Sequence, residues 1–190
     1  RWQNAHYQLP KLSPPHAIHG TVFNRPWTRI DPFKMTCELD SPWPWRGRVM
    51  SIIELTECQM CWTLDVQSKD AEMPVVMGWH PWFRRAPKKG IQADYQFDAK
   101  QIYERDDRGI PTGRRLVPGD GPFDDCFTHL TQNPSVTWSD GYRLELKSSC
   151  QHWVIYDEPT DAFCIEPQSA PPNAFNAFDF DKWESYSSTN

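Results

Sequence analysis

The stretch Val136–Leu146, VTWSDGYRLEL, is typical of a tight β-hairpin. Two short runs rich in β-branched, aromatic and leucine residues flank Ser-Asp-Gly, and Asp140-Gly141 can adopt the positive backbone angles that a tight turn needs. Side chains alternate between the two faces of a strand, so Tyr142, Leu144 and Leu146 share one face. The stretch therefore predicts two antiparallel strands joined by a short turn.

Similar short runs recur along the chain, and turn residues separate them. No apolar pattern keeps a helical period for long, and eighteen prolines interrupt the sequence. Many short strands with turns between them are typical of an all-β sandwich or barrel with few or no helices. Besides the hairpin, the expected strands are Val49–Leu55, Cys61–Val66, Val75–Trp79, Trp153–Tyr156 and Phe163–Ile165.

Length and charge narrow the class of protein. A chain of 190 residues with ten Trp and ten Phe can bury the core of one domain, which we expect to span residues 1–190. A formal charge of −5 argues against a nucleic-acid groove or an anionic membrane surface as partner. No apolar run approaches the ~20 residues of a transmembrane helix.

The six cysteines are irregularly spaced, and most of them lie in apolar stretches. Free buried thiols are therefore expected, which favours a cytoplasmic protein over a disulfide-bonded secreted one. Cys58 and Cys61 have the spacing of zinc ligands, but no second pair stands at a suitable distance in the sequence. We expect neither a metal nor another cofactor.

Two ionisable residues stand at the ends of expected strands, and each precedes a proline. His80 follows Val75–Trp79, and Glu166 follows Phe163–Ile165. A residue before proline is held extended, so each side chain would project from a fixed backbone, as catalytic groups on a sheet do. Taken alone, each residue is more simply a packed or surface residue.

Other polar residues add weight to a site. His19 is the second histidine of His16-Ala-Ile-His19-Gly20, and Asp124-Asp125 lies between aromatic residues. Adjacent residues of a strand face opposite sides, so at most one of the two aspartates faces a pocket. Arg84 and Arg85 suit an anionic group, although a solvated loop is the simpler reading.

Four segments, in this order, resemble the aldose 1-epimerase (galactose mutarotase) family. The resemblance extends from about residue 8 to residue 180, and the order and spacing of the segments carry it. The segments are Ala17-Ile-His19-Gly20 with Asn24-Arg-Pro-Trp27, Met73–Phe83 (MPVVMGWHPWF), Asp124-Asp-Cys-Phe127, and Phe163–Ser169 (FCIEPQS).

The resemblance implies a large antiparallel β-sandwich that binds a sugar on one concave face, and it implies roles for residues. Glu166 would be the general base and His80 the general acid. His19 would polarise the ring oxygen. Asp124, preferred to Asp125, would bind sugar hydroxyls. Apart from the resemblance, an aromatic ring such as that of Trp82 could stack on an apolar sugar face.

The resemblance leaves the exact activity open. Family members generally begin with further strands, including an Asn-Arg pair that contacts the sugar, so the chain is expected to be incomplete at its N-terminus. A hexose-6-phosphate epimerase would use Arg84 or Arg85 for the phosphate. A non-catalytic sugar-binding protein would not depend on Glu166. A glycosidase with Asp124 and Glu166 as its carboxylate pair would leave the histidines without a role.

Overall fold

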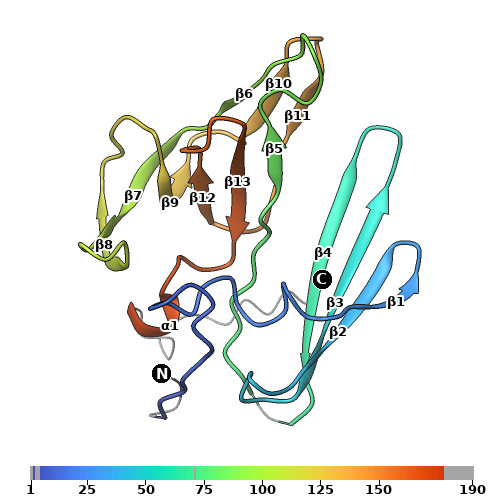
Figure 1. Ribbon diagram of the computed structural model, residues 1–190, viewed down its shortest axis with the longest axis vertical. Coiled ribbons are helices and arrows are strands. Elements are labelled where there is room, and N and C mark those ends of the chain that lie inside the picture. The colour runs from blue at the N-terminus through green and yellow to red at the C-terminus, as the bar shows by residue number, and fades with distance from the viewer. Residues whose placement is uncertain (1, 3–4, 71, 178–190) are drawn as a thin grey trace. The chain divides into compact units, whose positions relative to one another are not determined.

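The computed structural model describes residues 2, 5–70 and 72–177, and these form two compact units, Arg1–Val75 and Val76–Asn190. Thirteen strands and one four-residue helix, α1 (Ala174–Ala177), make up the regular structure of the described residues (Figure 1). Within these residues no helix is long and apolar enough to cross a membrane. The expectation of an all-β fold with few helices is confirmed.

The first unit contains one four-stranded antiparallel sheet in the order β1-β2-β3-β4. The expected strands Val49–Leu55 and Cys61–Val66 are joined by a turn that is closed by a 2.9 Å hydrogen bond from the Thr56 amide to the Gln59 carbonyl. Cys37 and Val49 are opposite each other and buried on one face of the sheet. The strands are β1 (Thr28–Asp31), β2 (Lys34–Leu39), β3 (Gly47–Leu55) and β4 (Met60–Ser68).

The second unit is a sandwich of two sheets. Six strands pair in the order β5-β13-β12-β9-β7-β8, as Figure 1 shows, and three pair in the order β11-β10-β6. The six-stranded sheet contains β5 (Trp82–Arg84), β7 (Ala99–Arg105), β8 (Pro111–Leu116), β9 (Asp124–Leu130), β12 (His152–Tyr156) and β13 (Ala162–Gln168). The other contains β6 (Ala93–Gln96), β10 (Ser135–Trp138) and β11 (Arg143–Glu145).

The predicted hairpin Val136–Leu146 is confirmed as β10 and β11. Gly141 has a φ of 99°, and the Trp138 amide donates to the Tyr142 carbonyl at 2.8 Å. Val136 of β10 is fully buried in a core that fills the space between the two sheets. The buried members of this core are Ala93, Phe127, Val136, Trp153, Ile155, Phe163 and Ile165.

Two strand boundaries differ from the prediction. Val75–Trp79 forms no strand; it carries a single bridge, from Gly78 to Gln168. Strand β13 does not end at Glu166 but continues through Pro167 to Gln168. The Pro167 carbonyl accepts a hydrogen bond from the Trp79 amide at 3.1 Å. The amide and carbonyl of one strand residue point to the same side, so the nitrogen of Pro167 faces away from β12 and costs no ladder bond there.

Candidate active site

Strand β13 divides its side chains between the core and the opposite face of the six-stranded sheet. Phe163 and Ile165 point into the core between the sheets. Their neighbours Cys164 and Glu166 therefore point to the other face, since side chains alternate along a strand. We call this the outer face; it is the face of the six-stranded sheet that the three-stranded sheet does not cover.

The pairing of β5 with β13 places His80 beside Glu166. Cys164 is opposite Trp82 in this antiparallel pair. Continuing the same register by two residues, forward from Cys164 and backward from Trp82, places Glu166 opposite His80. His80 Nε2 lies 3.2 Å from Glu166 Oε1. His80 thus precedes β5 and does not end a strand before it, which corrects the strand-end prediction, but Pro81 still fixes its backbone beside Glu166.

Glu166 is a buried acid. Its side chain is 6% exposed, whereas that of His80 is 35% exposed. Burial raises the pKa of Glu166 to about 7, an effect that a hydrogen bond from Gln168 opposes and the charge of Asp124 reinforces. The site therefore holds a carboxyl group that changes its protonation state near neutral pH.

Two neighbours hold the imidazole of His80. Cys164 Sγ lies 3.4 Å from His80 Nδ1, and the ring of Trp82 stacks on the imidazole with centroids 5.4 Å apart. Burial and the nearby Glu166 raise the pKa of the Cys164 thiol, so the neutral thiol is the stable form. A thiol S–H can donate to Nδ1, which would leave the proton of a neutral imidazole on Nε2, toward Glu166.

The carboxylate chosen from the resemblance lies on the outer face. Asp124 is opposite Tyr156, which is opposite Cys164, so these three side chains form one row across the sheet. Asp125 is opposite Ile155, whose side chain lies in the core. Arg105 bridges both aspartates, at 3.2 Å from Asp124 and 2.9 Å from Asp125. Sequence reasoning missed this arginine, because nothing local to it indicates carboxylate partners on another strand.

The two arginines after Trp82 have different environments. Arg84 is exposed and, by alternation, lies on the same face as Trp82. Arg85 is tied to the turn after β12, because its guanidinium donates to the carbonyls of Asp157 and Pro159 and lies 5.1 Å above the Phe163 ring. Arg85 therefore has a structural role, and only Arg84 fits the prediction of an anion contact.

His19 belongs to the first unit, so the structure describes it only within that unit. It has a φ of 66°, is exposed, and its ring meets Phe23 edge-on at 5.4 Å. Its place in the sugar site stays a prediction from the resemblance.

The outer face holds a second histidine that sequence reasoning missed. His152 is 8% exposed, lies opposite Gln168 of β13, and its Nδ1 is 3.3 Å from the Tyr103 hydroxyl. Burial, with the charges of Arg115 and His129, lowers the pKa of His152 to about 4. The alternation of β12, with Trp153 and Ile155 in the core, is the signal that could have placed His152 on this face.

The buried His152 predicts a loss of stability in acid. Between pH 6.5 and about 4 the unfolded chain protonates this histidine and the folded chain does not, so stability falls as the pH falls. The difference between this pKa and the ordinary value of about 6.5 corresponds to a loss of about 3 kcal/mol in the free energy of unfolding once the pH has fallen to about 4. Urea unfolding at pH 7 and pH 4.5 should show a smaller pH-dependent loss in His152→Gln than in the wild type. The exposed His6→Gln is the control, and equal losses in all three proteins would contradict the account.

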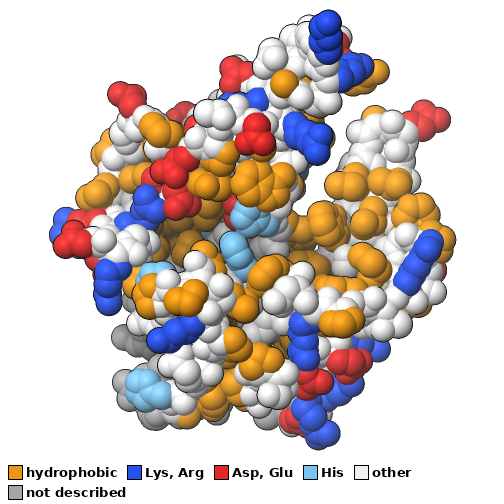
Figure 2. All heavy atoms as spheres, viewed as in Figure 1, with side chains coloured by type: hydrophobic (Ala, Val, Ile, Leu, Met, Phe, Trp, Pro, Cys, Tyr) orange, Lys and Arg blue, Asp and Glu red, His pale blue; other side chains and the backbone are white. Residues whose placement is uncertain are grey.

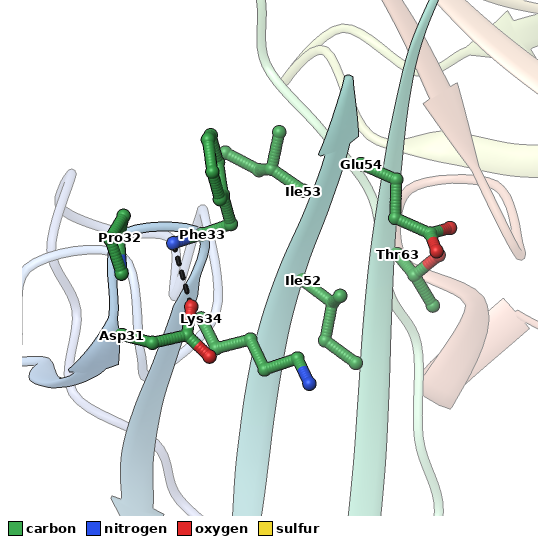
Figure 3. Close-up of a pocket in the computed structure, with 8 residues that line it drawn as sticks. All are labelled: Asp31, Pro32, Phe33, Lys34, Ile52, Ile53, Glu54 and Thr63. Atoms are coloured by element: carbon green, nitrogen blue, oxygen red, sulfur yellow. Dashed lines mark hydrogen bonds between the residues drawn. The ribbon is translucent and has the colours of Figure 1, made fainter. Parts of the chain in front are cut away.

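Figure 2 shows acidic and histidine side chains lying among hydrophobic ones over the region of β12 and β13. Two hollows lie elsewhere. One is on the first unit, where Phe33, Lys34 and Ile52 line it and the Phe33 amide donates to Asp31 Oδ1 at 2.8 Å (Figure 3). Another, lined by Tyr95 and polar neighbours, does not include Glu166. Neither hollow holds a histidine, so the acid–base pair remains the candidate site.

A comparison with protein families decides what kind of protein carries this pair. Residues 1–181 match the model of the aldose 1-epimerase family. The chain belongs to the aldose 1-epimerase family. No curated protein matches it. The expectation drawn from the four resembling segments is therefore confirmed at the level of the family.

A solved structure supports the fold of this family member. The chain is similar to a galactose mutarotase-like protein from Clostridium acetobutylicum, with a TM-score of 0.77 and 19% sequence identity. The match covers 93% of this chain and 66% of that chain. The mutarotase-like β-sandwich fold of this epimerase-family chain is thereby confirmed, while the chain spans about two thirds of the length of that relative.

Proposed function

We propose that this chain is a mutarotase, an aldose 1-epimerase that interconverts the α and β anomers of a hexose by general acid–base catalysis. The observation that carries the proposal is the contact of His80 Nε2 with Glu166 Oε1 at 3.2 Å on the outer face. Membership of the aldose 1-epimerase family supports a sugar as substrate.

The reaction requires one base and one acid at neighbouring oxygens. Glu166 as the carboxylate takes the proton of the anomeric hydroxyl while His80 as the imidazolium gives a proton to the ring oxygen and becomes neutral, and the bond from C1 to the ring oxygen breaks. The resulting aldehyde turns about its bond to C2. On closure, the hydroxyl formed from the ring oxygen attacks the other face of the carbonyl and returns its proton to His80. Glu166 then protonates the new anomeric oxygen, so both residues regain their starting states.

The geometry and electrostatics of the pair suit this sequence of transfers. The anomeric oxygen and the ring oxygen are both bonded to C1. An acid and a base that lie next to each other can therefore each contact one of these two oxygens. A base whose pKa lies near 7 is a stronger proton acceptor than an ordinary glutamate and is still substantially ionised at neutral pH. The stacked Trp82 and the Cys164 thiol hold the imidazole in place for its transfer.

Further residues are proposed to bind the sugar. Asp124 would accept hydrogen bonds from hydroxyl groups, and Trp82, which is 52% exposed, would pack against an apolar sugar face. The resemblance also gives His19 the role of polarising the ring oxygen.

A second candidate is a hexose-6-phosphate 1-epimerase. The observation that favours it is Arg84, an exposed cation on the same face as Trp82. A guanidinium can bind a phosphate through two parallel hydrogen bonds, so Arg84 could hold a substrate phosphate.

Polarimetry tests the proposal and separates the candidates. Freshly dissolved α-D-glucose, α-D-galactose and α-D-glucose 6-phosphate are followed with and without the protein. Faster relaxation of a free hexose supports the mutarotase, and acceleration of the phosphate alone supports the second candidate. Unchanged relaxation of all three, with release of sugar from an aryl glycoside or with sugar binding alone, would contradict both.

A further inference from the structure

The outer face carries a mixed set of metal-binding side chains that the acid–base mechanism does not require. His80, Cys164 and Glu166 offer an imidazole nitrogen, a thiol sulfur and a carboxylate oxygen, all within 4.8 Å of one another. We propose that these three residues bind one Zn²⁺ ion, and that the bound ion blocks the acid and the base. The blocking rests on the proposed epimerase function; the binding does not.

The three groups lie close to the spacing of a zinc site. Ligand atoms at the corners of a tetrahedral site with Zn–N and Zn–O distances near 2.0 Å and Zn–S near 2.3 Å lie about 3.3–3.7 Å apart. His80 Nε2 lies 3.2 Å from the Glu166 carboxylate, and the other nitrogen, Nδ1, lies 3.4 Å from the Cys164 sulfur. With a single His80 nitrogen as ligand, the three ligand atoms lie within 4.8 Å of one another. Side-chain rotations that shorten the longest of these separations would gather the three groups around one ion.

The chemistry of the set selects the metal. A thiolate with an imidazole and one carboxylate favours zinc and disfavours magnesium and calcium, which prefer oxygen ligands. Cys164 would lose its proton to the solvent on binding. The thiolate and the carboxylate together carry two negative charges, which the ion neutralises. A buried carboxylate without full compensation is costly, so an ion of opposite charge stabilises Glu166 where it stands.

The strands hold the set with access from one side. Cys164 and Glu166 are two residues apart on β13, so their side chains share one face, and both are buried. The pairing of β13 with β5 places His80 across from them. His80 is 35% exposed, which provides an entry path and leaves a fourth position for water. An ion here uses the nitrogen or the carboxylate oxygen that the proton transfers need, so it cannot coexist with turnover.

Another pair of thiols could bind zinc independently. Cys58 lies in the turn between β3 and β4, Cys61 is the second residue of β4, and both are exposed. The double variant Cys58→Ser/Cys61→Ser removes this pair without touching the outer face. It is therefore the background in which the site is tested.

Binding is measured on the full chain with Zn²⁺ by calorimetry and with Co²⁺ by absorption, because a cobalt–thiolate bond gives a near-ultraviolet charge-transfer band. The double variant should bind one equivalent of Zn²⁺ and show the band. Adding Cys164→Ser should abolish the band, and adding His80→Gln should weaken Zn²⁺ binding by at least about 100-fold. Circular dichroism checks that each protein is folded; since His80 is partly exposed, its variant still provides the test if Cys164→Ser does not fold.

The outcomes separate binding from blocking. If the double variant binds no Zn²⁺, or if it binds Zn²⁺ equally well after His80→Gln, the proposed zinc site is wrong. If the wild type accelerates anomer exchange, Zn²⁺ should inhibit it over the concentration range in which it binds, and a chelator should restore it. If Zn²⁺ binds at the site but does not inhibit anomer exchange, the proposal that the ion blocks the acid and the base is wrong. Absence of epimerase activity would count against the proposed function while the calorimetry and the cobalt spectrum still report on the site.

Discussion

Replacing Glu166 by glutamine is expected to lower the rate of anomer exchange by about 10²–10⁴-fold, the usual contribution of a positioned general base. Glutamine has nearly the same shape but cannot accept the proton of the anomeric hydroxyl. Because Glu166 is 6% exposed, a neutral amide there is also easier to bury than a carboxylate. The variant should therefore be folded and at least as stable as the wild type at pH 8, while it is nearly inactive.

The matched control for this change is Glu145→Gln, which makes the same chemical substitution on β11 of the other sheet. It should retain wild-type activity. Polarimetric relaxation with each protein at equal concentration measures both effects. A Glu166→Gln variant that keeps more than about a tenth of the activity would remove Glu166 from the role of base.

Replacing Phe163 by alanine is expected to lower the free energy of unfolding by about 3–5 kcal/mol, the usual cost of deleting a buried phenyl ring. Phe163 is fully buried, and its ring lies 5.6 Å from that of Phe83 and 5.0 Å from that of Tyr95. The guanidinium of Arg85 covers it at 5.1 Å. A cavity there removes contacts from both sheets, and it also loosens the strand that carries Cys164 and Glu166.

Urea unfolding followed by near-ultraviolet circular dichroism measures this loss. Tyr142→Ala is the control, because Tyr142 is 74% exposed and a surface substitution usually changes stability by no more than about 0.5 kcal/mol. A loss below about 1 kcal/mol for Phe163→Ala would show that the sandwich core is not organised around this ring.

The sequence predicted the strands whose pairing is local. The hairpin Val136–Leu146 and the strands around the turn at Thr56–Gln59 bring their own turn chemistry, so the pattern and the structure agree. The strand predicted at Val75–Trp79 was wrong. This apolar run between prolines has the composition of a strand, but it forms only one bridge, between Gly78 and Gln168. A strand needs a partner along its length, and composition does not show whether one is present.

The site was predicted as a set of residues but not as a geometry. The resemblance named His80 and Glu166, yet their contact depends on the register of β5 against β13, two strands far apart in the sequence. The same limit hid His152 and Arg105, whose partners stand on other strands. The proline after Glu166 indicated an extended backbone correctly, because Glu166 lies within β13, whereas His80 precedes β5.

The most direct test of the central claim is magnetisation-exchange NMR on equilibrated D-glucose and D-galactose in the presence of the wild-type protein. No net reaction occurs at equilibrium, so only catalysed interconversion transfers magnetisation between the two anomeric protons. The proposed pair of Glu166 and His80 predicts exchange cross-peaks for at least one sugar whose rate rises in proportion to protein concentration. Broadened sugar signals without such exchange would show binding alone and would contradict the claim that this outer face catalyses ring opening.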